Sequence, residues 1–358
     1  MFRYIGRPAV ALFLGLAIPA CGTIQADLRT TSPSATTSAP RSSQPPPSAT
    51  ATPDALAERM VATIELGGGP DMPTEAFGSM WVLAVDGPLL NDGTSPAVHR
   101  IDPDTNLVIA SIPVPGRLCQ GLGASPEAIW ACGPDGLIRI DPTTNEAVAS
   151  IDLPAPLAAS RIPYGAGSVW AFATTTVGPD HVVRLDPATN SVTATIELDH
   201  VAGTMAFGFD ALWVSAPADH LLLRIDPATN AVQEWTSGIE RPGIIAVGDD
   251  ALWISLLFEH AQEPGADEST VTRIDPWTGE VIASIATGGT LGDEGGIAAT
   301  ADAIWIRGPR PWLVRIDPAT NEVIERIDAR GGPGDVGAAF GTVWATNADY
   351  GEILRIEP

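Results

Sequence analysis

The histidines are the first side chains here whose type and spacing could support a reaction or a metal site. Four of the five directly follow an acid, in the pairs Asp180-His181, Asp199-His200, Asp219-His220 and Glu259-His260. A zinc site needs at least three ligands that converge within a few ångströms. The spacing assigns no such set, so two interpretations stay open: a divalent-cation site that would take Mg²⁺ or Ca²⁺, and ordinary solvated histidines in loops.

Several other kinds of chemistry are excluded or unsupported. The chain has no lysine, which excludes a lysine Schiff base and pyridoxal phosphate enzymes of the usual kind. No Ser-His-Asp or Cys-His arrangement stands out, and no quinone ligands can be identified. The formal net charge of −24 would repel phosphate, so nucleic acid is not an expected partner. We therefore assign no catalytic residue and no resident cofactor from the sequence.

The elements that must position these side chains are marked by a repeat. The sequence Arg-Ile-Asp-Pro-Ala-Thr-Asn occurs at 224–230 and 315–321, with related copies starting at Arg100, Arg139, Arg184 and Arg273 and a shortened copy at Arg355. Successive arginines are 39, 45, 40, 49, 42 and 40 residues apart. A period of about 40 residues is typical of a four-stranded propeller blade. Asp-Pro opens a type I turn, and the final Asn or Gly tolerates positive φ.

Tryptophans give a second count of the same unit. One tryptophan precedes each repeat arginine within a short apolar run, at Trp81, Trp130, Trp170, Trp213, Trp253, Trp305 and Trp344. We interpret them as core side chains between neighbouring sheets. The predicted fold is therefore all-β: a seven-bladed β-propeller of four-stranded antiparallel blades. The segment 60–66 matches an outer strand, so we expect it to pair with the last blade and close the ring. The repeat arginines are expected to form ion pairs with acids of adjacent blades.

The combined pattern of tryptophan strand, Arg-Ile-Asp and Thr-Asn resembles the YVTN-repeat propellers, which are similar to quinoprotein dehydrogenase propellers. The resemblance covers residues 60–358, and Val343-Trp-Ala-Thr-Asn347 comes close to the signature itself. It implies a seven-bladed ring in a family whose roles are poorly defined and often non-catalytic. The other blades carry Trp-Val, Trp-Ala or Trp-Ile in place of Tyr-Val-Thr-Asn.

The repeats also resemble those of streptogramin lyases, which are seven-bladed propellers. That family uses histidines, a nearby glutamate and a bound magnesium ion. Its Glu-x-His pair has no match here, because Glu259 and His260 are adjacent and the spacing from Glu197 to His200 is one residue too long. No catalytic residue can be carried over.

The N-terminal segment predicts export. Arg3 and Arg7 precede a short apolar run, and Ile18-Pro-Ala-Cys21-Gly22 resembles the bacterial lipobox, although Pro19 departs from the small residue that is usual there. We expect a signal peptide at 1–20, lipidation of Cys21, a Ser/Thr/Pro-rich tether at 21–58 and the propeller at 59–358. The alternative is ordinary signal cleavage, with Cys21 discarded or left free. Without residues 1–20 the chain loses two arginines and no acid, so its formal charge changes from −24 to −26.

Two cysteines remain in the predicted propeller. Cys119 and Cys132 flank a hairpin centred near Ser125 and Pro126, and we expect a disulfide between them. Two buried free thiols are the alternative.

Function is expected on the face where the loops vary. The loops after the tryptophan strands and after the outer strands share this face, and they place on it Arg117, Arg161, Tyr164, His200, His220, Arg241, His260, Arg307, Arg310, Arg330, Asp335, Asp349 and Tyr350. From these we select as ligand-binding candidates His200, His220, Arg241, His260, Arg307, Arg310 and Tyr350.

The expected protein is a monomeric ligand-binding or protein-interaction module, held on the outer side of the cytoplasmic membrane by its lipid alone. Its partner would be a small molecule or an envelope protein. The alternative is a metal-dependent lyase or lactone hydrolase with its site on the same face.

Overall fold

The computed structural model describes residues 55–85, 96–114, 120–154, 157, 160–174, 179–237, 239–256, 270–288, 296–307, 312–330 and 334–358. All of them belong to the unit Ala51–Pro358. Within these ranges the regular structure is almost entirely β, as expected from the repeat, and the strands form seven four-stranded sheets with antiparallel neighbours.

Six sheets are built from consecutive strands, which run from the inner to the outer edge of each blade. The first three sheets are β2 (Gly69–Ala76), β3 (Ser79–Val85), β4 (Ala97–Asp102), β5 (Leu107–Pro113); β6 (Leu122–Ser125), β7 (Ala128–Cys132), β8 (Gly136–Asp141), β9 (Glu146–Asp152); and β10 (Tyr164–Gly165), β11 (Ser168–Ala173), β12 (Asp180–Asp186), β13 (Ser191–Leu198). The next three are β14 (Met205–Gly208), β15 (Ala211–Ala216), β16 (Leu221–Ile225), β17 (Val232–Ser237); β18 (Pro242–Val247), β19 (Leu252–Leu256), β20 (Thr270–Ile274), β21 (Val281–Ala286); and β22 (Gly296–Ala299), β23 (Ile304–Arg307), β24 (Trp312–Asp317), β25 (Glu322–Asp328).

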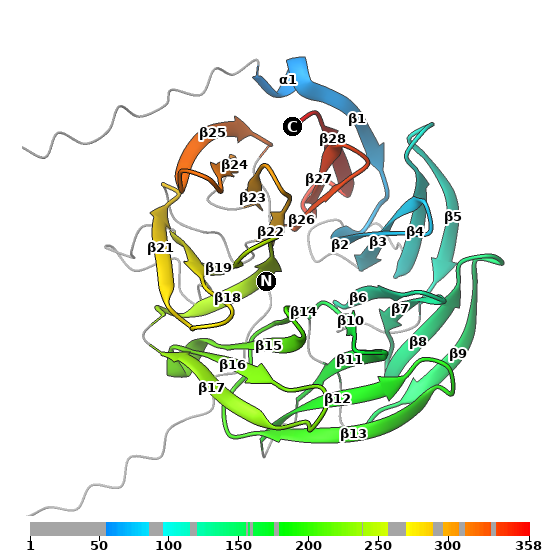
Figure 1. Ribbon diagram of the computed structural model, residues 1–358. Helices are drawn as coiled ribbons and strands as arrows, with labels where there is room; N and C mark the ends of the chain where they lie inside the picture. Colours follow the sequence, from blue (N-terminus) through cyan, green and yellow to red (C-terminus); the bar gives the residue numbers. More distant parts are fainter. Residues whose placement is uncertain are drawn as a thin grey trace, which may run out of the picture. The chain divides into compact units, whose positions relative to one another are not determined.

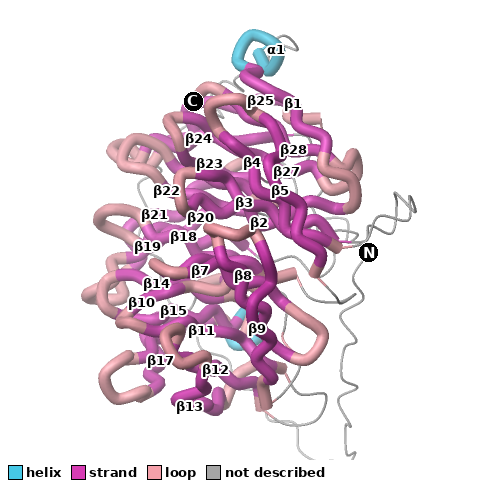
Figure 2. Tube along the Cα trace, turned by 90° about the vertical axis from the view of Figure 1, so that its right-hand side faces the viewer, coloured by secondary structure: helices cyan, strands magenta, loops and turns pink. Residues whose placement is uncertain are grey.

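The seventh sheet joins the two ends of the unit. It contains β26 (Val336–Ala339), β27 (Thr342–Asn347), β28 (Glu352–Ile356) and, at its outer edge, β1 (Met60–Glu65). Strand β1 pairs antiparallel with β28, with Ala62 opposite Arg355 and Ile64 opposite Ile353. Each inner strand contacts the inner strand of the next sheet, and β26 contacts β2. The seven blades therefore form a ring (Figure 1), and Figure 2 shows the same ring from the side.

The repeat tryptophans form the core between the sheets, as predicted. All seven are 0–1% exposed, and they are among the largest fully buried side chains of the described residues. Five of their indole N–H groups donate to an acceptor five residues earlier: Trp81 to the Ala76 carbonyl at 3.0 Å and Trp213 to the Gly208 carbonyl at 2.9 Å, for example, and likewise Trp130, Trp170 and Trp344. A buried indole needs such a partner for its single donor.

The Asp-Pro turns also have the predicted conformation. The last turn residue has φ between 56° and 59° at Asn106, Asn145, Asn190, Asn230 and Asn321, and 74° at Gly279. Asp102 accepts from the Asp104 backbone N–H at 2.9 Å and from the Thr105 hydroxyl at 3.0 Å. Hydrogen bonds of this kind, from the backbone first and then from threonine, lower the pKa of the Asp102 and Asp186 carboxyls. Asp102 thus serves the turn.

The prediction that the repeat arginines form ion pairs with acids of adjacent blades is wrong for five of them, because these arginines donate hydrogen bonds to uncharged oxygens of the next blade instead. In five sheets the arginine Nη1 donates to a proline carbonyl and to an asparagine Oδ1 in the turn of the next sheet: Arg100 to Pro142 and Asn145, Arg139 to Pro187 and Asn190, Arg184 to Pro227 and Asn230, Arg273 to Pro318 and Asn321, and Arg355 to Pro103 and Asn106. The turn carboxylates are used by their own backbone; Asp141, for example, accepts from Thr143 N–H at 2.7 Å. Among the residues that the structure describes, the acids that form ion pairs with repeat arginines are Glu127 and Asp250, each in the same blade as its arginine.

Each repeat arginine also lies over the tryptophan of its own sheet. The guanidinium carbon is between 4.8 Å, for Arg273 over Trp253, and 6.0 Å, for Arg224 over Trp213, from the centre of that tryptophan ring. Cation–π contact and hydrogen bonds to the next turn therefore act through one side chain. This arginine joins the core of one blade to the surface turn of its neighbour.

The described chain starts with a short helix, α1 (Ala55–Arg59), at the end of the predicted tether. Its Leu56 is buried against the last two blades, and Arg59 Nη1 lies 2.8 Å from Glu325 Oε2 of β25. In the described ranges no helix has the length and hydropathy needed to cross a bilayer. The predicted signal peptide and Cys21 lie outside these ranges, as does Cys119.

In the hairpin that contains Cys132, the two strands are paired differently from the pairing that would place Cys119 opposite Cys132. Leu122 pairs with Ala131, and Cys132 N–H donates to the Gly121 carbonyl at 2.9 Å. Gly121, and not Cys119, is therefore opposite Cys132, which is buried. Cys132 is nevertheless disulfide-bonded, and its partner lies outside the described residues, so the pairing with Cys119 stays a prediction.

Candidate ligand-binding site

A cavity of about 280 Å³ lies at the centre of the ring. Its walls come from inner strands of four blades, with Thr74 and Glu75 on β2, Ile245 and Ala246 on β18, Ile297, Ala298 and Ala299 on β22, and Val336, Gly337 and Ala338 on β26. The inner strands line the cavity because the inner strand of each sheet lies next to the inner strands of the neighbouring sheets. Most of these residues are small and apolar, which leaves room at the axis where the blades converge.

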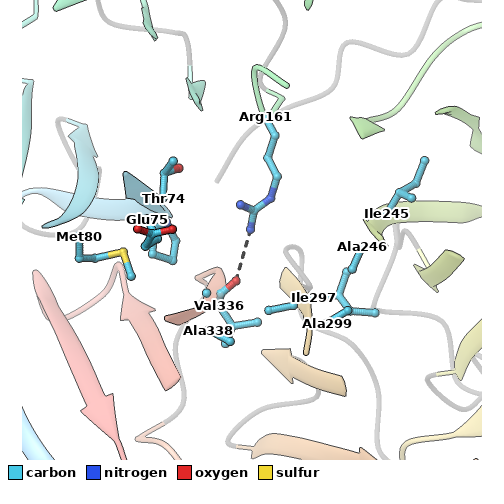
Figure 3. A pocket seen from close by; sticks show the side chains of 13 residues that line it. Thr74, Glu75, Met80, Arg161, Ile245, Ala246, Ile297, Ala299, Val336 and Ala338 are labelled. Carbon is cyan, nitrogen blue, oxygen red and sulfur yellow. Dashed lines mark hydrogen bonds between the residues drawn. The ribbon is translucent and has the colours of Figure 1, made fainter. Parts of the chain in front are cut away.

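One arginine extends across this channel (Figure 3). Arg161 precedes β10 in the third blade, and its Nη2 lies 2.5 Å from Asp335 Oδ2 and 3.3 Å from the Val336 carbonyl oxygen, both in the seventh blade. The arginine side chain is 27% exposed, and that of Asp335 is 6% exposed. An ion pair with one partner so well buried is screened much less by salt than an exposed surface pair.

Asp335 is itself held in place from two directions. Its backbone N–H donates to Thr346 Oγ1 at 2.7 Å, and its Oδ1 accepts from the Val336 N–H at 2.7 Å. Thr346 is fully buried on β27. The carboxylate therefore has little freedom, and it fixes the guanidinium of Arg161 at the cavity.

Most of the hydrogen-bonding capacity of Arg161 remains available. A guanidinium has five N–H groups. The hydrogen bonds of Arg161 to described residues all come from Nη2, so Nε and Nη1, with three N–H groups, have no protein acceptor there. A charged donor group that is fixed in position beside apolar walls is the arrangement found in small-molecule sites.

The histidine candidates form a second cluster, on the fourth blade. His200 Nδ1 lies 2.9 Å from Asp219 Oδ2, and its Nε2 lies 3.4 Å from Glu234 Oε1. His220, with φ 57°, accepts at Nδ1 from the Arg241 backbone N–H at 3.2 Å. The structure thus connects His200 to Asp219 and His220 to Arg241, and Asp219 and His220 are neighbours in the chain. None of these residues lines the central cavity.

The remaining candidates are spread over other places. Arg307 is 2% exposed at the end of β23 and donates to the Thr346 and Ala329 carbonyls, so it supports the blade interface. Tyr350 is 56% exposed in the turn between β27 and β28. His260 and Arg310 lie outside the described residues. Among the residues that the structure describes, no three His, Cys, Asp or Glu side chains group closely enough to hold a metal ion.

Sequence reasoning placed Arg161 and Asp335 on the variable face but did not select either as a candidate. They are 174 residues apart, and neither belongs to a repeated motif. A signal did exist: each lies within three residues of the start of an inner strand. The candidate histidines were singled out because each follows an acid in the chain, but His200 contacts Asp219 and Glu234, which are not its neighbours in sequence.

Comparison with known proteins supports the fold. No protein-family model matches the sequence, and no curated protein sequence matches it. Among solved structures, a streptogramin B lyase is similar with a TM-score of 0.62 and 18% identity, over 83% of this chain and 96% of that one. Hydrazine synthase of Kuenenia stuttgartiensis is similar with a TM-score of 0.63 and 12% identity, over 83% and 97% of the two chains. U3-55K has a TM-score of 0.63 at 9% identity, over 84% and 100%.

At these identities the likeness shows the propeller fold alone. Membership in the YVTN-repeat family, which rests on residues 343–347 and the repeat pattern, stays a prediction.

Proposed function

We propose that this protein is an exported binding module that holds a small-molecule ligand in the channel of its propeller. The observation that carries the proposal is the fixed guanidinium of Arg161, with three N–H groups facing no described protein acceptor at a cavity of about 280 Å³. Small-molecule sites combine apolar walls with a few fixed polar groups, and this cavity has both. The candidate residues His200, His220, Arg241 and Tyr350 lie elsewhere, and we assign them no part in this binding.

A thermal-shift screen of the full-length protein in detergent tests the proposal. Ligands at 100 times their Kd should stabilise the wild type by about 2.7 kcal/mol, and Arg161→Gln should abolish this shift. Arg330→Gln is the matched control, because Arg330 is a half-exposed arginine that does not line the cavity. Stabilisation that persists in Arg161→Gln, or is lost equally in Arg330→Gln, would contradict the proposal. Arg161→Lys, which keeps the charge, checks that the loss is not a failure to fold.

The membrane anchor is part of the same proposal and has its own test. The signal-like segment before Cys21 supports lipidation of that cysteine and attachment to the outer side of the cytoplasmic membrane. A labelled fatty acid should be incorporated into the wild type in the membrane fraction. Cys21→Ala should lose the label and be released. Label that stays in Cys21→Ala, or wild-type protein without label, would rule the anchor out.

A second candidate function is a metal-dependent lyase or lactone hydrolase on the variable face. The likeness to streptogramin B lyase gives it weak support, whereas His200, Asp219 and Glu234 do not group closely enough to hold a metal ion. Elemental analysis of the purified protein separates the two functions. Stoichiometric Mg, Ca or Zn that disappears in the His200→Ala and His260→Ala variants would support the enzyme. An unchanged metal content in both variants would leave the enzyme without its site.

A further inference from the structure

The charges at the cavity restrict what the channel can bind. Arg161 and Glu75 are the only charged side chains among the residues that line it. The charge of Arg161 is already compensated by Asp335 at 2.5 Å, whereas Glu75 is exposed on β2 and has no ion pair with a described residue. Figure 3 shows both side chains at the cavity. The local charge is therefore negative, and a cationic group is favoured close to Glu75.

The N–H donors of Arg161 require an acceptor on the ligand, in contrast to the cationic group that Glu75 favours. Its Nε and Nη1 groups need an acceptor, and a carboxylate is the strongest one for a guanidinium. A ligand with only a carboxylate would bring a third negative charge beside Glu75 and Asp335. A ligand with only an ammonium group would leave the donors of Arg161 to water. A ligand that carries both groups satisfies Glu75 and Arg161 together.

The walls and the volume restrict the rest of the ligand. The other described residues that line the cavity are alanines, isoleucines, a glycine, a valine, a proline and a methionine, with Thr74 as a further polar side chain, so the ligand body has to be largely apolar. The volume of about 280 Å³ is just below the range of about 300–1,000 Å³ that is usual for drug-sized ligands. The body must therefore be small.

We infer that the channel binds a small zwitterion with an apolar side, of the chemical class of a free α-amino acid, with its carboxylate on Arg161 and its ammonium group on Glu75. This inference rests on the proposed function, since it names the ligand class of the same cavity.

Calorimetric titration of the full-length protein in detergent tests the inference. The twenty free amino acids are titrated singly, and the tightest apolar one is then compared with its deaminated acid and its decarboxylated amine. We expect each analogue to bind at least tenfold more weakly. Glu75→Gln should weaken the amino acid at least tenfold and leave the deaminated acid unchanged or tighter. A residue that only supported the fold would weaken both ligands alike.

Glu322→Gln is the control, because Glu322 is an exposed carboxylate on the outer strand β25. It should leave all affinities unchanged. The inference is overturned if no amino acid binds, if the deaminated acid binds as tightly as its parent, or if Glu75→Gln has no effect. Screening hits that depend on Arg161 would in that case still uphold the proposed function, whereas hits independent of Arg161 would remove both.

Discussion

His99 is a buried histidine whose environment disfavours its charged form. It lies on β4 and is 7% exposed, with Nδ1 2.9 Å from Ser111 Oγ and with Nε2 buried and lacking a described partner. Burial lowers the pKa of His99 below its ordinary value of 6.5. The neutral imidazole is therefore the form that the fold accommodates, because an imidazolium would bring an unpaired charge into the blade.

The lowered pKa of His99 predicts a loss of stability in mild acid. Below pH 6.5 the unfolded chain binds a proton at this site and the folded chain does not, so the free energy of unfolding falls as the pH drops toward the folded pKa. The slope from one proton is at most about 1.4 kcal/mol per pH unit. Urea unfolding of wild type and His99→Asn between pH 5 and 7 measures it. The variant should lose less stability with falling pH, and identical slopes would contradict the assignment.

Arg161 illustrates how much one residue can depend on tertiary structure. Its charge is ordinary in the sequence, and its importance comes from a partner in the opposite part of the ring. No local pattern pairs position 161 with position 335. The positive φ of about 60° at the turn asparagines, in contrast, can be predicted from the residue type alone. Residue-level prediction therefore succeeded for backbone shape, whereas no local pattern could predict the contact of Arg161 with Asp335.

At the level of the repeated element, the fourth and fifth blades show how one change is accommodated. Gly279 replaces the turn asparagine, so Arg224 of the preceding blade lacks the usual acceptor. Trp235 occupies this region instead: its ring centre is 5.4 Å from the Arg224 guanidinium carbon. In the pairing of β16 with the outer strand β17, the register shift lies at Leu222 and Leu223 of β16. In most of the other sheets the shift lies directly after the repeat arginine. An aromatic face thus takes the place of an amide oxygen.

Restoring the consensus residue at this turn should therefore be harmful. A Cβ atom at position 279 would lie 2.9 Å from the Trp235 carbonyl oxygen and 2.9 Å from Thr236 Oγ1. We expect Gly279→Asn to destabilise the protein by about 1–3 kcal/mol in urea unfolding, because the neighbours must shift. Stabilisation by Gly279→Asn would show that Trp235 does not replace the asparagine.

The reciprocal change, Asn321→Gly, serves as the matched variant. It keeps the positive φ of the turn but removes the 2.9 Å hydrogen bond from Arg273 Nη1. A hydrogen bond to a charged group contributes about 1.5–3 kcal/mol, and Arg273 keeps its bonds to Pro318 and Asp250, so a loss of about 1–2 kcal/mol is expected. An unchanged midpoint of urea unfolding in Asn321→Gly would mean that the turn asparagines matter only for backbone shape.

Across the whole molecule, strand β1 joins the beginning of the propeller to its last blade. It supplies the outer edge of the seventh sheet, and Ile64 and Leu66 are 6% and 8% exposed. Without this strand, β28 would present unpaired backbone groups, and two apolar side chains would be lost from the core. The repeat arginine of the same sheet, Arg355, contacts the turn of the first blade.

Removal of β1 should weaken the entire ring. Two buried aliphatic side chains contribute about 1.5–3 kcal/mol each, so a protein lacking residues 1–66 should lose more than about 3 kcal/mol and unfold with a broader transition. A protein lacking residues 1–54 is the control, because it keeps α1 and β1. Thermal unfolding followed by circular dichroism provides the comparison. Equal midpoints for the two proteins would contradict a role of β1 in holding the ring.

The fold was predictable from the sequence because the propeller repeats its own local chemistry. Seven tryptophans, seven arginines and a recurring Asp-Pro turn define the period without any long-range information. The partners of the arginines were not predictable in the same way, since opposite charge was the natural expectation and neutral oxygens of Pro142 and Asn145 were the outcome. The proposed ligand site was harder still to predict, because it lies where non-repeated residues of different blades meet.

Ligand binding in the channel is tested most directly by native mass spectrometry of the protein isolated from its own cells. We predict a small-molecule adduct on the wild-type protein, absent from Arg161→Gln and retained in His200→Gln, because Arg161 lines the cavity and His200 does not. An adduct that persists in Arg161→Gln and disappears in His200→Gln would place the site at His200 and contradict binding in the channel.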